Sequence, residues 1–414
     1  MLTRAIDELV RREGPQVLAG LIRWSGDFDL AEEAFQVACA QALEAWPRRG
    51  LPRRPGAWLT TVARRRAVDL MRRRRPDVPL EPEMLELLEL HGSPGAEYAE
   101  PGEPPEVEDD RLRLLFTVCH PALAPAAQVA LALRTLCGLT TSEIARAHLE
   151  PEATTAQRMV RAKRKIAEAG IPFEVPAADR LSERLDGVLS TIYLVFNEGF
   201  SATEGESWIR PDLCAEAIRL GRLVVELLPD TPEAEGLLAL MLLHDARRPS
   251  RTAADGTLVP LEEQDRTCWD RAGIIEGTAV LDRAVARGRA GPYQLQAAIA
   301  ALHARAARPE DTDWPQIAAL YGALLRTTPG PIVELNAAAA VAMAHGAEAG
   351  LAWMERLERS GALDGYHLLP ASQADLLRRL GRTEEARAAY GRALALVRHP
   401  AERRFLERRL AELG

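Results

Sequence analysis

Seven arginines fall within the last twelve residues of the segment 55–75, which reads PGAWLTTVARRRAVDLMRRRR. Its apolar residues recur at the i, i+3, i+4 spacing of a helix that is buried on one side. Asp69 is the only acid in this segment, so its own side chains cannot neutralise the arginines. Guanidinium groups hold phosphates with paired N–H donors. The pattern indicates a polyanionic partner, and a solvated basic face is the alternative interpretation of such a charge run.

A second basic segment, residues 137–170, has the pattern of two short helices separated by a turn. Thr141 or Ser142 is expected to cap the first helix, and the second helix is expected to begin at Thr154. A basic helix of this length fits the major groove, where its N-terminal half reaches base edges. A helical hairpin that does not bind DNA is the alternative. The side chains expected to face inward on the second helix are Met159, Val160 and Ile166.

Charge is distributed unevenly along the 414 residues, and the net charge of −8 conceals this. Residues 1–75 carry a balance of +6 and residues 111–170 a balance of +5, whereas residues 76–110 contain no Lys or Arg and reach −12. The Pro, Gly and Glu content of 76–110 cannot bury a core, so this segment is expected to be an extended acidic linker. It is either a hydrated spacer or the occupant of a positively charged groove that nucleic acid would otherwise fill.

Composition and hydropathy predict an all-α protein of the cytoplasm. Aromatic residues make up only 5%, no alternating β-branched stretch predicts a sheet, and no long uncharged apolar run predicts a membrane span or a signal peptide. The five cysteines are widely spaced and form no CxxC or Cys/His cluster. The eight histidines are scattered, with only His120 beside a cysteine, Cys119. We therefore expect no enzymatic activity, no catalytic residue, no metal site and no cofactor.

A series of motifs in the first 170 residues resembles, in order and spacing, the extracytoplasmic-function (ECF) class of bacterial sigma-70 family factors. The motifs read DLAEEAFQ, ALEAWP, PGAWLTTVARRRAVDLMRRR, SEIARAH and RAKRKI. The chain departs from the family pattern at Arg66, where Asn is more usual, and in having AVD in place of AID. The resemblance implies a sigma region 2 helical bundle over 1–75, a flexible acidic linker over 76–110 and a region 4 helix-turn-helix over 111–172.

The same resemblance implies partners and site residues. The partners would be promoter DNA and core RNA polymerase, bound through the β′ clamp helices and the β flap, with the linker threading the polymerase cleft. The core polymerase would be bound by Asp29, Glu32, Glu33 and Gln36. The −10 element would be bound by the loop from Trp46 to Arg54 and the helix after it, through Trp46, Arg48, Arg49, Arg64, Arg65, Arg66, Asp69, Arg72 and Arg73. The −35 element would be bound by Thr154, Thr155, Gln157, Arg158, Arg161, Arg164 and Lys165.

The region 180–414 extends beyond the sigma core. It is expected to open with a buried helix that stops at Asn197 and Gly199. Near its end, small and aromatic residues follow an order close to that of a tetratricopeptide (TPR) repeat, which predicts an α-solenoid of degenerate TPR-like helix pairs. With this extension the chain resembles the ECF subgroup that bears a long C-terminal TPR-like domain, in which the extension would be regulatory and could bind a protein partner. The repeat-like residues are Ala374, Gly381, Ala386, Tyr390, Ala393 and Pro400.

An alternative function remains open: a helix-turn-helix transcriptional regulator with a TPR protein-interaction domain, acting without replacing sigma. The motifs of residues 28–75 argue against it, because an operator-binding regulator does not need them.

The two basic segments are expected to contribute differently to DNA binding. Arg158→Ala should cost about 1–3 kcal/mol and relax base preference, because that side chain would read a base edge. Removing Arg72 and Arg73 together should weaken binding to every sequence and flatten its salt dependence, because these side chains would meet phosphates. Binding titrations on matched and scrambled promoters at several salt concentrations separate the two effects. Unchanged promoter preference in the Arg158 variant would contradict the recognition-helix assignment.

Overall fold

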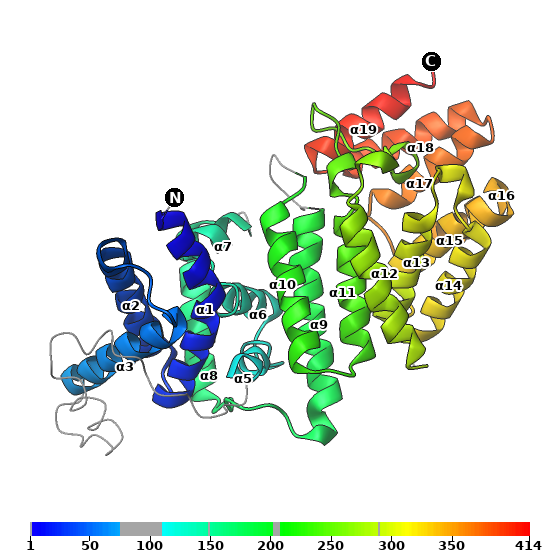
Figure 1. Ribbon diagram of the computed structural model, residues 1–414. Coiled ribbons are helices and arrows are strands. Elements are labelled where there is room, and N and C mark those ends of the chain that lie inside the picture. The colour runs from blue at the N-terminus through cyan, green and yellow to red at the C-terminus, as the bar shows by residue number, and fades with distance from the viewer. Residues whose placement is uncertain (1, 75–109, 148–149, 202–207, 289) are drawn as a thin grey trace. The chain divides into compact units, whose positions relative to one another are not determined.

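The computed structural model describes residues 2–74, 110–147, 150–201, 208–288 and 290–414 (Figure 1). These residues are helical throughout, and the only extended pairing among them is an isolated bridge between Thr252 and Leu258. The chain forms two compact units, Met1–Thr191 and Ile192–Gly414. Of the predicted linker 76–110, only Asp110 lies within the described residues.

The first unit opens with three helices, α1 (Leu2–Ser25), α2 (Phe28–Arg49) and α3 (Pro55–Arg74), which pack on one another. Asp27 caps α2 by accepting hydrogen bonds from the amides of Asp29 and Leu30. Gly50 ends α2 at a φ of 88°, a value that a residue with a Cβ rarely adopts. The short turn that follows brings α3 back against α2.

The apolar stripe predicted on 55–75 is buried in this bundle, which confirms the amphipathic pattern. Trp58, an aromatic member of the stripe, meets Trp46 of α2 edge to face with ring centroids 5.3 Å apart. A helix that buries one arc exposes the opposite one, so the core contacts of α3 direct its cationic residues outward. The buried residues of the stripe are Trp58, Leu59, Val62, Ala63, Ala67, Val68 and Leu70.

Before α9 (Ala178–Phe200), the described residues of the first unit form four further helices. They are α5 (Asp110–Val118), α6 (Pro125–Thr135), α7 (Thr141–Ala147) and α8 (Glu152–Glu168). The cap of α7 is Thr140, one residue before the predicted position: its hydroxyl accepts a hydrogen bond from the amide of Glu143, whose carboxylate accepts one from the amide of Thr140. This reciprocal pair is a capping box.

One prediction for α8 was wrong. Val160 is 60% exposed instead of facing inward. The buried face of α8 consists of Thr155, Met159, Ala162 and Ile166, which follow one another at intervals of three or four residues. Val160 is adjacent to Met159 and therefore points about 100° away from that face.

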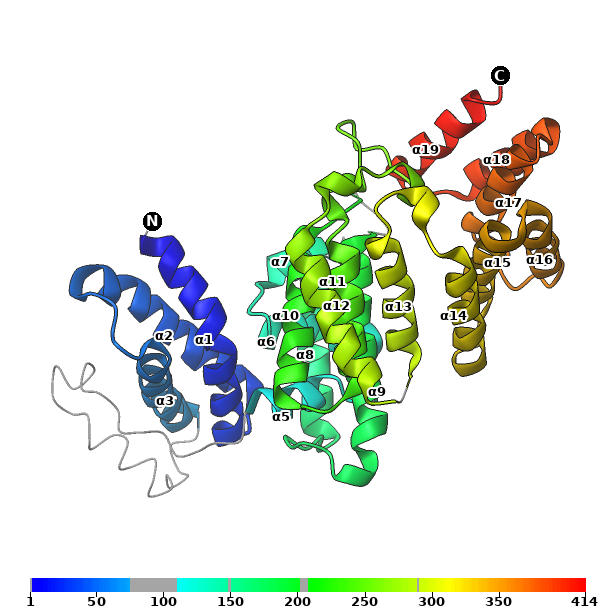
Figure 2. The same cartoon turned by 45° about the vertical axis from the view of Figure 1, so that its right-hand side comes forward.

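The second unit consists of consecutive helices that pack on their neighbours (Figures 1 and 2). Proline occupies one of the first two positions of many of them, where no amide needs an intrahelical acceptor. Helix α9 (Ala178–Phe200) carries residues of both units. The others are α10 (Pro211–Leu227), α11 (Pro232–Asp245), α12 (Arg271–Ala286), α13 (Pro292–Arg305), α14 (Trp314–Thr327), α15 (Pro331–His345), α16 (Ala347–Arg359), α17 (Leu368–Arg379), α18 (Thr383–Leu396) and α19 (Pro400–Ala411).

Helix α9 ends at Phe200, one residue beyond the predicted stop at Asn197 and Gly199. Gly199 lies inside the helix because α10 approaches it closely. A Cβ at Gly199 would stand 2.7 Å from the amide nitrogen of Cys214. The glycine therefore permits close contact between α10 and the last turn of α9.

The repeat-like residues at the C-terminal end are packed as small residues between paired helices would be. Ala374 of α17 and Ala386, Tyr390 and Ala393 of α18 are buried in one core cluster. Gly381 lies in the turn between the two helices with a φ of 72°. The same close packing occurs between α15 and α16 at Gly350, where a Cβ would stand 2.3 Å from the Cβ of Ala342 and 2.6 Å from the carbonyl oxygen of Ala338.

The close contact of α15 and α16 at Gly350 predicts how much an added methyl group destabilises the protein. Gly350→Ala should destabilise the protein by about 1–3 kcal/mol, because the backbones of α15 and α16 must separate. The matched control is Gly391→Ala in α18, where a Cβ meets nothing within 4 Å and the higher helix propensity of Ala favours the fold. Thermal unfolding of the full chain measures both changes. Equal midpoints for the two variants would contradict the close-packing explanation.

Candidate nucleic-acid interface

The cationic arc of α3 forms the first part of the candidate interface. Arg64, Arg65 and Arg66 are half-buried near the middle of the helix, and Arg72 and Arg73 are exposed toward its end. Asp69 is exposed between the two groups. The apolar side of α3 anchors these residues on the bundle core. The arrangement suits contacts with a row of phosphates, which needs several guanidinium groups along one edge.

The loop expected from Trp46 to Arg54 is shorter in the structure. Helix α2 runs to Arg49, so only residues 50–54 connect it to α3. Trp46 is 0% exposed, because it packs against Trp58 and fixes the angle between α2 and α3. It therefore presents no surface to a base in this conformation. Arg48 is exposed and pairs with Glu44 at 3.3 Å.

The acidic edge of α2 is partly occupied by α8. The ammonium group of Lys163 lies 3.0 Å from Oδ1 of Asp29 and 2.9 Å from Oε2 of Glu32. Arg134 of α6 lies 3.9 Å from the other oxygen of Glu32. The side chains of Lys163 and Glu32 are only 11% and 14% exposed, so water screens this pair less than a surface pair. The predicted polymerase-binding residues thus hold the first unit together in this conformation.

A groove beside this contact leaves the rest of the acidic edge accessible. Its volume is about 400 Å³, and it lies between α1, α2 and α6. Phe35, Gln36 and Leu43 of α2 line one side, and Arg134 and Thr140 line the other. Glu33 is exposed outside the groove. The structure therefore brings Asp29, Glu32 and Gln36 to one surface of α2 and places two of them in ion pairs.

The residues predicted to read the −35 element fall into two groups on α8. Five of them line one open depression of about 420 Å³, which α8 shares with residues near the start of α6; these five are Thr154, Gln157, Arg158, Arg161 and Lys165. Thr155 is 0% exposed, and its hydroxyl donates to Glu150 at 2.6 Å. Arg158 donates through Nη2 to the other oxygen of Glu150, at 2.6 Å. Arg164 is exposed and pairs with Glu168 at 2.8 Å.

These bonds give Thr155 a structural position and tie Arg158 to the turn before α8. A base contact by Arg158 would require it to leave Glu150, whereas Arg161 and Lys165 are exposed as they stand. Glu150 and Arg134 were not predicted as functional residues, and Lys163 was expected to face outward, whereas its side chain is only 11% exposed. Lys163 had a usable signal, since it lies four residues after Met159 and three before Ile166, which places it beside the buried face.

The Cys119–His120 pair lacks the features of an activated nucleophile. Burial raises the pKa of the Cys119 thiol to about 12. Burial and the nearby Arg184 lower the pKa of His120. A thiol is reactive as thiolate, so this environment opposes nucleophilic chemistry. Among the described residues no group of acidic, histidine or cysteine side chains could hold a metal ion, and no helix is long and apolar enough to cross a membrane.

Comparison with known proteins identifies a known family in the N-terminal helices. Residues 9–76 match the family Sigma-70 region 2, and residues 184–285 match a family of unknown function, DUF6596. The uncharacterized protein R00370 of Rhizobium meliloti (strain 1021) is 48% identical over 400 residues, which cover 97% of this chain and 94% of that protein. This chain belongs to the family of the rhizobial protein. No solved structure matches the chain.

The sigma-70 region 2 match spans most of α1 and the whole of α2 and α3. It therefore contains both the acidic edge of α2 and the cationic arc of α3. Sigma-70 region 2 points to a role in transcription initiation, with core RNA polymerase as partner.

Proposed function

We propose that this protein is a sigma factor of the ECF class, which binds core RNA polymerase and directs promoter-specific transcription initiation. The observation that carries the proposal is the cationic arc of α3 within a sigma-70 region 2 domain. In this domain Asp29, Glu32, Glu33 and Gln36 bind the β′ clamp helices. Contacts with the −10 element come from the arginines of α3 and from Arg48, Arg49 and Asp69, while Trp46 supports them by holding α2 against α3.

Helices α7 and α8 act as the region 4 helix-turn-helix in this proposal and are held by the β flap. The exposed side chains of Thr154, Gln157, Arg161 and Lys165 support contact with the −35 element, and Arg158 joins them after release from Glu150. Arg164 meets the DNA backbone from the same helix. Thr155 contributes by fixing the turn before α8.

The second unit is the regulatory part of the proposed sigma factor. Its paired helices and the close packing of small residues between them support a solenoid of degenerate TPR-like pairs. Such solenoids bind proteins through extended surfaces, so we assign to it a protein partner or a contact with polymerase.

Reconstituted transcription tests the proposal. Purified protein with core polymerase should give promoter-specific transcripts in the absence of any other sigma factor. The truncated form should end after Ser201 and not at residue 180, because α9 contributes to the first unit: Arg184 donates to the carbonyl of Phe116 at 2.6 Å, and Thr191 donates to Gln128 at 3.0 Å. Activity only after truncation would make the second unit inhibitory, and activity only with it would make it an activator.

Failure of both forms to initiate would contradict the sigma assignment. Operator binding without initiation would then favour the alternative, a helix-turn-helix regulator with a TPR protein-interaction domain that acts without replacing sigma. The sigma-70 region 2 match is the observation that argues against this alternative.

The ion pairs of Lys163 predict a competition with polymerase. Because Asp29 and Glu32 bind Lys163 in the free protein, the core enzyme must displace α8 before it can use them. Lys163→Ala should therefore raise affinity for the core about fivefold, the equivalent of about 1 kcal/mol. Arg164→Ala removes an equal charge from an exposed pair on the same helix and is the control. Fluorescence anisotropy with labelled protein measures both affinities, and equal affinities for the two variants would contradict the competition.

A further inference from the structure

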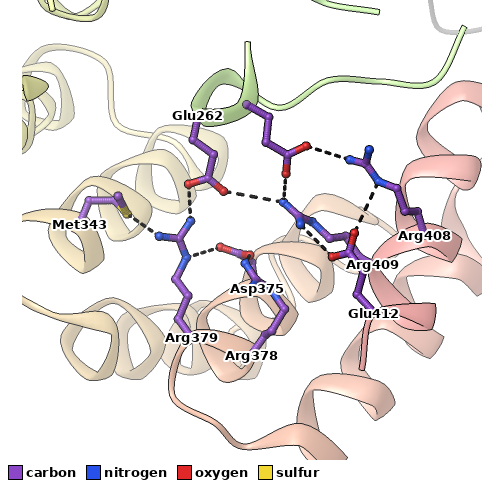
Figure 3. Close-up of polar contacts among 9 residues, drawn as sticks. Glu262, Met343, Asp375, Arg378, Arg379, Arg408, Arg409 and Glu412 are labelled. Carbon is purple, nitrogen blue, oxygen red and sulfur yellow. Dashed lines mark hydrogen bonds and ion pairs between the residues drawn. The ribbon is translucent and has the colours of Figure 1, made fainter. Parts of the chain in front are cut away.

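Among the described residues of the second unit, three arginines combine full or partial burial with the lack of an ion pair. Arg247, Arg251 and Arg266 belong to the segment that joins α11 to α12, and none has a carboxylate within ion-pair distance among the described residues. Arg251 is 6% exposed and Arg266 is 7% exposed. By contrast, Arg379, Arg408 and Arg409 form a network of ion pairs with Glu262 and Glu263 (Figure 3). The side chains of Arg379 and Arg408 are also more exposed than those of Arg251 and Arg266.

Aromatic rings and a carbonyl group surround Arg251. Its guanidinium carbon lies 3.3 Å from the ring centroid of Phe200 and 4.3 Å from that of Trp208, and it donates to the carbonyl oxygen of Phe200. The guanidinium of Arg247 lies 6.0 Å from the same Phe200 ring. Two cations therefore lie within 6.0 Å of the centre of one aromatic ring. Rings and carbonyls stabilise a cation but do not neutralise its charge.

Two histidines extend the cluster. Nη2 of Arg247 lies 3.0 Å from Nδ1 of His244, and Arg266 donates to the carbonyl oxygen of His303 at 2.7 Å. Burial and the neighbouring arginines lower the pKa of His303 to about 4 and hold that of His244 well below its usual value. Both imidazoles are thus neutral near pH 7 and can donate one N–H each.

Unpaired donors remain near these groups. Within the described part of the chain, Nε1 of Trp208 and Nε of Arg266 are buried without a hydrogen-bond acceptor. Three carboxylates act on the cluster from beyond ion-pair distance. Burial lowers the pKa of both Arg251 and Arg266, while Asp245, which also lies 3.6 Å from Arg248, raises that of Arg251, and Asp311 and Glu310 raise that of Arg266. Burying several cations without a carboxylate in direct contact is unfavourable, and an oxyanion held by guanidinium forks offsets that cost.

We propose that Arg247, Arg251 and Arg266 form a binding site for a small phosphate-bearing molecule. The cluster carries three positive charges, so a dianionic phosphate group suits it better than a monoanion. Arg251 and Arg266 are fixed by their carbonyl and aromatic contacts, while the half-buried Arg247 is the member that an incoming ligand can reach. The site lies in the second unit and does not depend on the proposed sigma activity.

Binding of inorganic phosphate to the full chain tests the site. Isothermal titration at constant ionic strength, with chloride as the balancing anion, should show saturable binding of one phosphate. Arg247→Gln should weaken this binding at least about tenfold, the usual loss for one charge-assisted hydrogen bond or more. Arg222→Gln is the matched control, because Arg222 belongs to the same unit and pairs with Glu276 on the surface. It should leave phosphate affinity unchanged. In parallel, the imidazole resonances of His303 should shift on phosphate addition to the wild type.

Several outcomes would overturn the proposal. Absence of saturable binding, or equal weakening by Arg247→Gln and Arg222→Gln, would reduce the effect to general charge. Tighter binding of succinate than of phosphate would assign the site to dicarboxylates. Glu204 and Glu206 lie outside the described residues, and phosphate binding that appears only in the E204Q/E206Q double variant would identify the counter-charge as part of this chain. Thermal unfolding of each variant without phosphate establishes that it is folded.

Discussion

Burial of one face of α3 is the constraint on which the N-terminal unit depends. Removing a large aliphatic or aromatic side chain from water contributes about 1.5–3 kcal/mol, and α3 buries five such side chains, among them Trp58, together with two alanines. The edge-to-face contact of Trp58 with Trp46 sets the angle between α3 and α2. Once that face is fixed, Arg72 and Arg73 are exposed to solvent, and Arg64, Arg65 and Arg66 lie half-buried beside it. The packing of the core and the presentation of positive charge are therefore one arrangement.

The charged surfaces of the first unit form ion pairs within the free protein and are also the surfaces that the proposed sigma factor would use to bind its partners. The acidic edge of α2 lies in the sigma-70 region 2 domain and is also a partner of Lys163 on α8. A pair of this kind holds two helices together in the free protein. Both side chains can bind other partners once the pair separates. Glu150 plays a comparable part at the start of α8, where it binds Thr155 and Arg158. In the proposed function, binding to polymerase and promoter replaces these internal contacts.

In the second unit, arginines that form ion pairs hold helices together, whereas buried arginines without an ion pair form the candidate site. Glu262 and Glu263 connect the segment between α11 and α12 to α17 and α19 through paired charges (Figure 3). A few residues away in the same segment, Arg251 and Arg266 are buried against rings and carbonyls instead. Whether an arginine forms an ion pair thus depends on which carboxylates the fold places beside it.

Much of the helical structure and the location of the candidate interface could be predicted from local patterns. Helical periodicity predicted the buried face of α3, and Pro, Thr and Gly near the helix ends placed several boundaries to within a residue or two. Errors arose where a distant contact overrides a local signal. Trp46 was assigned to a loop because its contact with Trp58, which lies twelve residues later in the chain, is not evident from the local sequence.

The sequence by itself determined the all-helical class, the cationic helix and the motifs of sigma region 2, because these are properties of neighbouring residues and regular spacing. Only the tertiary structure decided which charges are paired. Lys163 and Asp29 are separated by 134 positions, and no periodicity relates them, yet folding places their charged atoms 3.0 Å apart. The same holds for the unpaired arginines near Phe200. Charge pairing depends on distances through space, and those are fixed only when the helices pack.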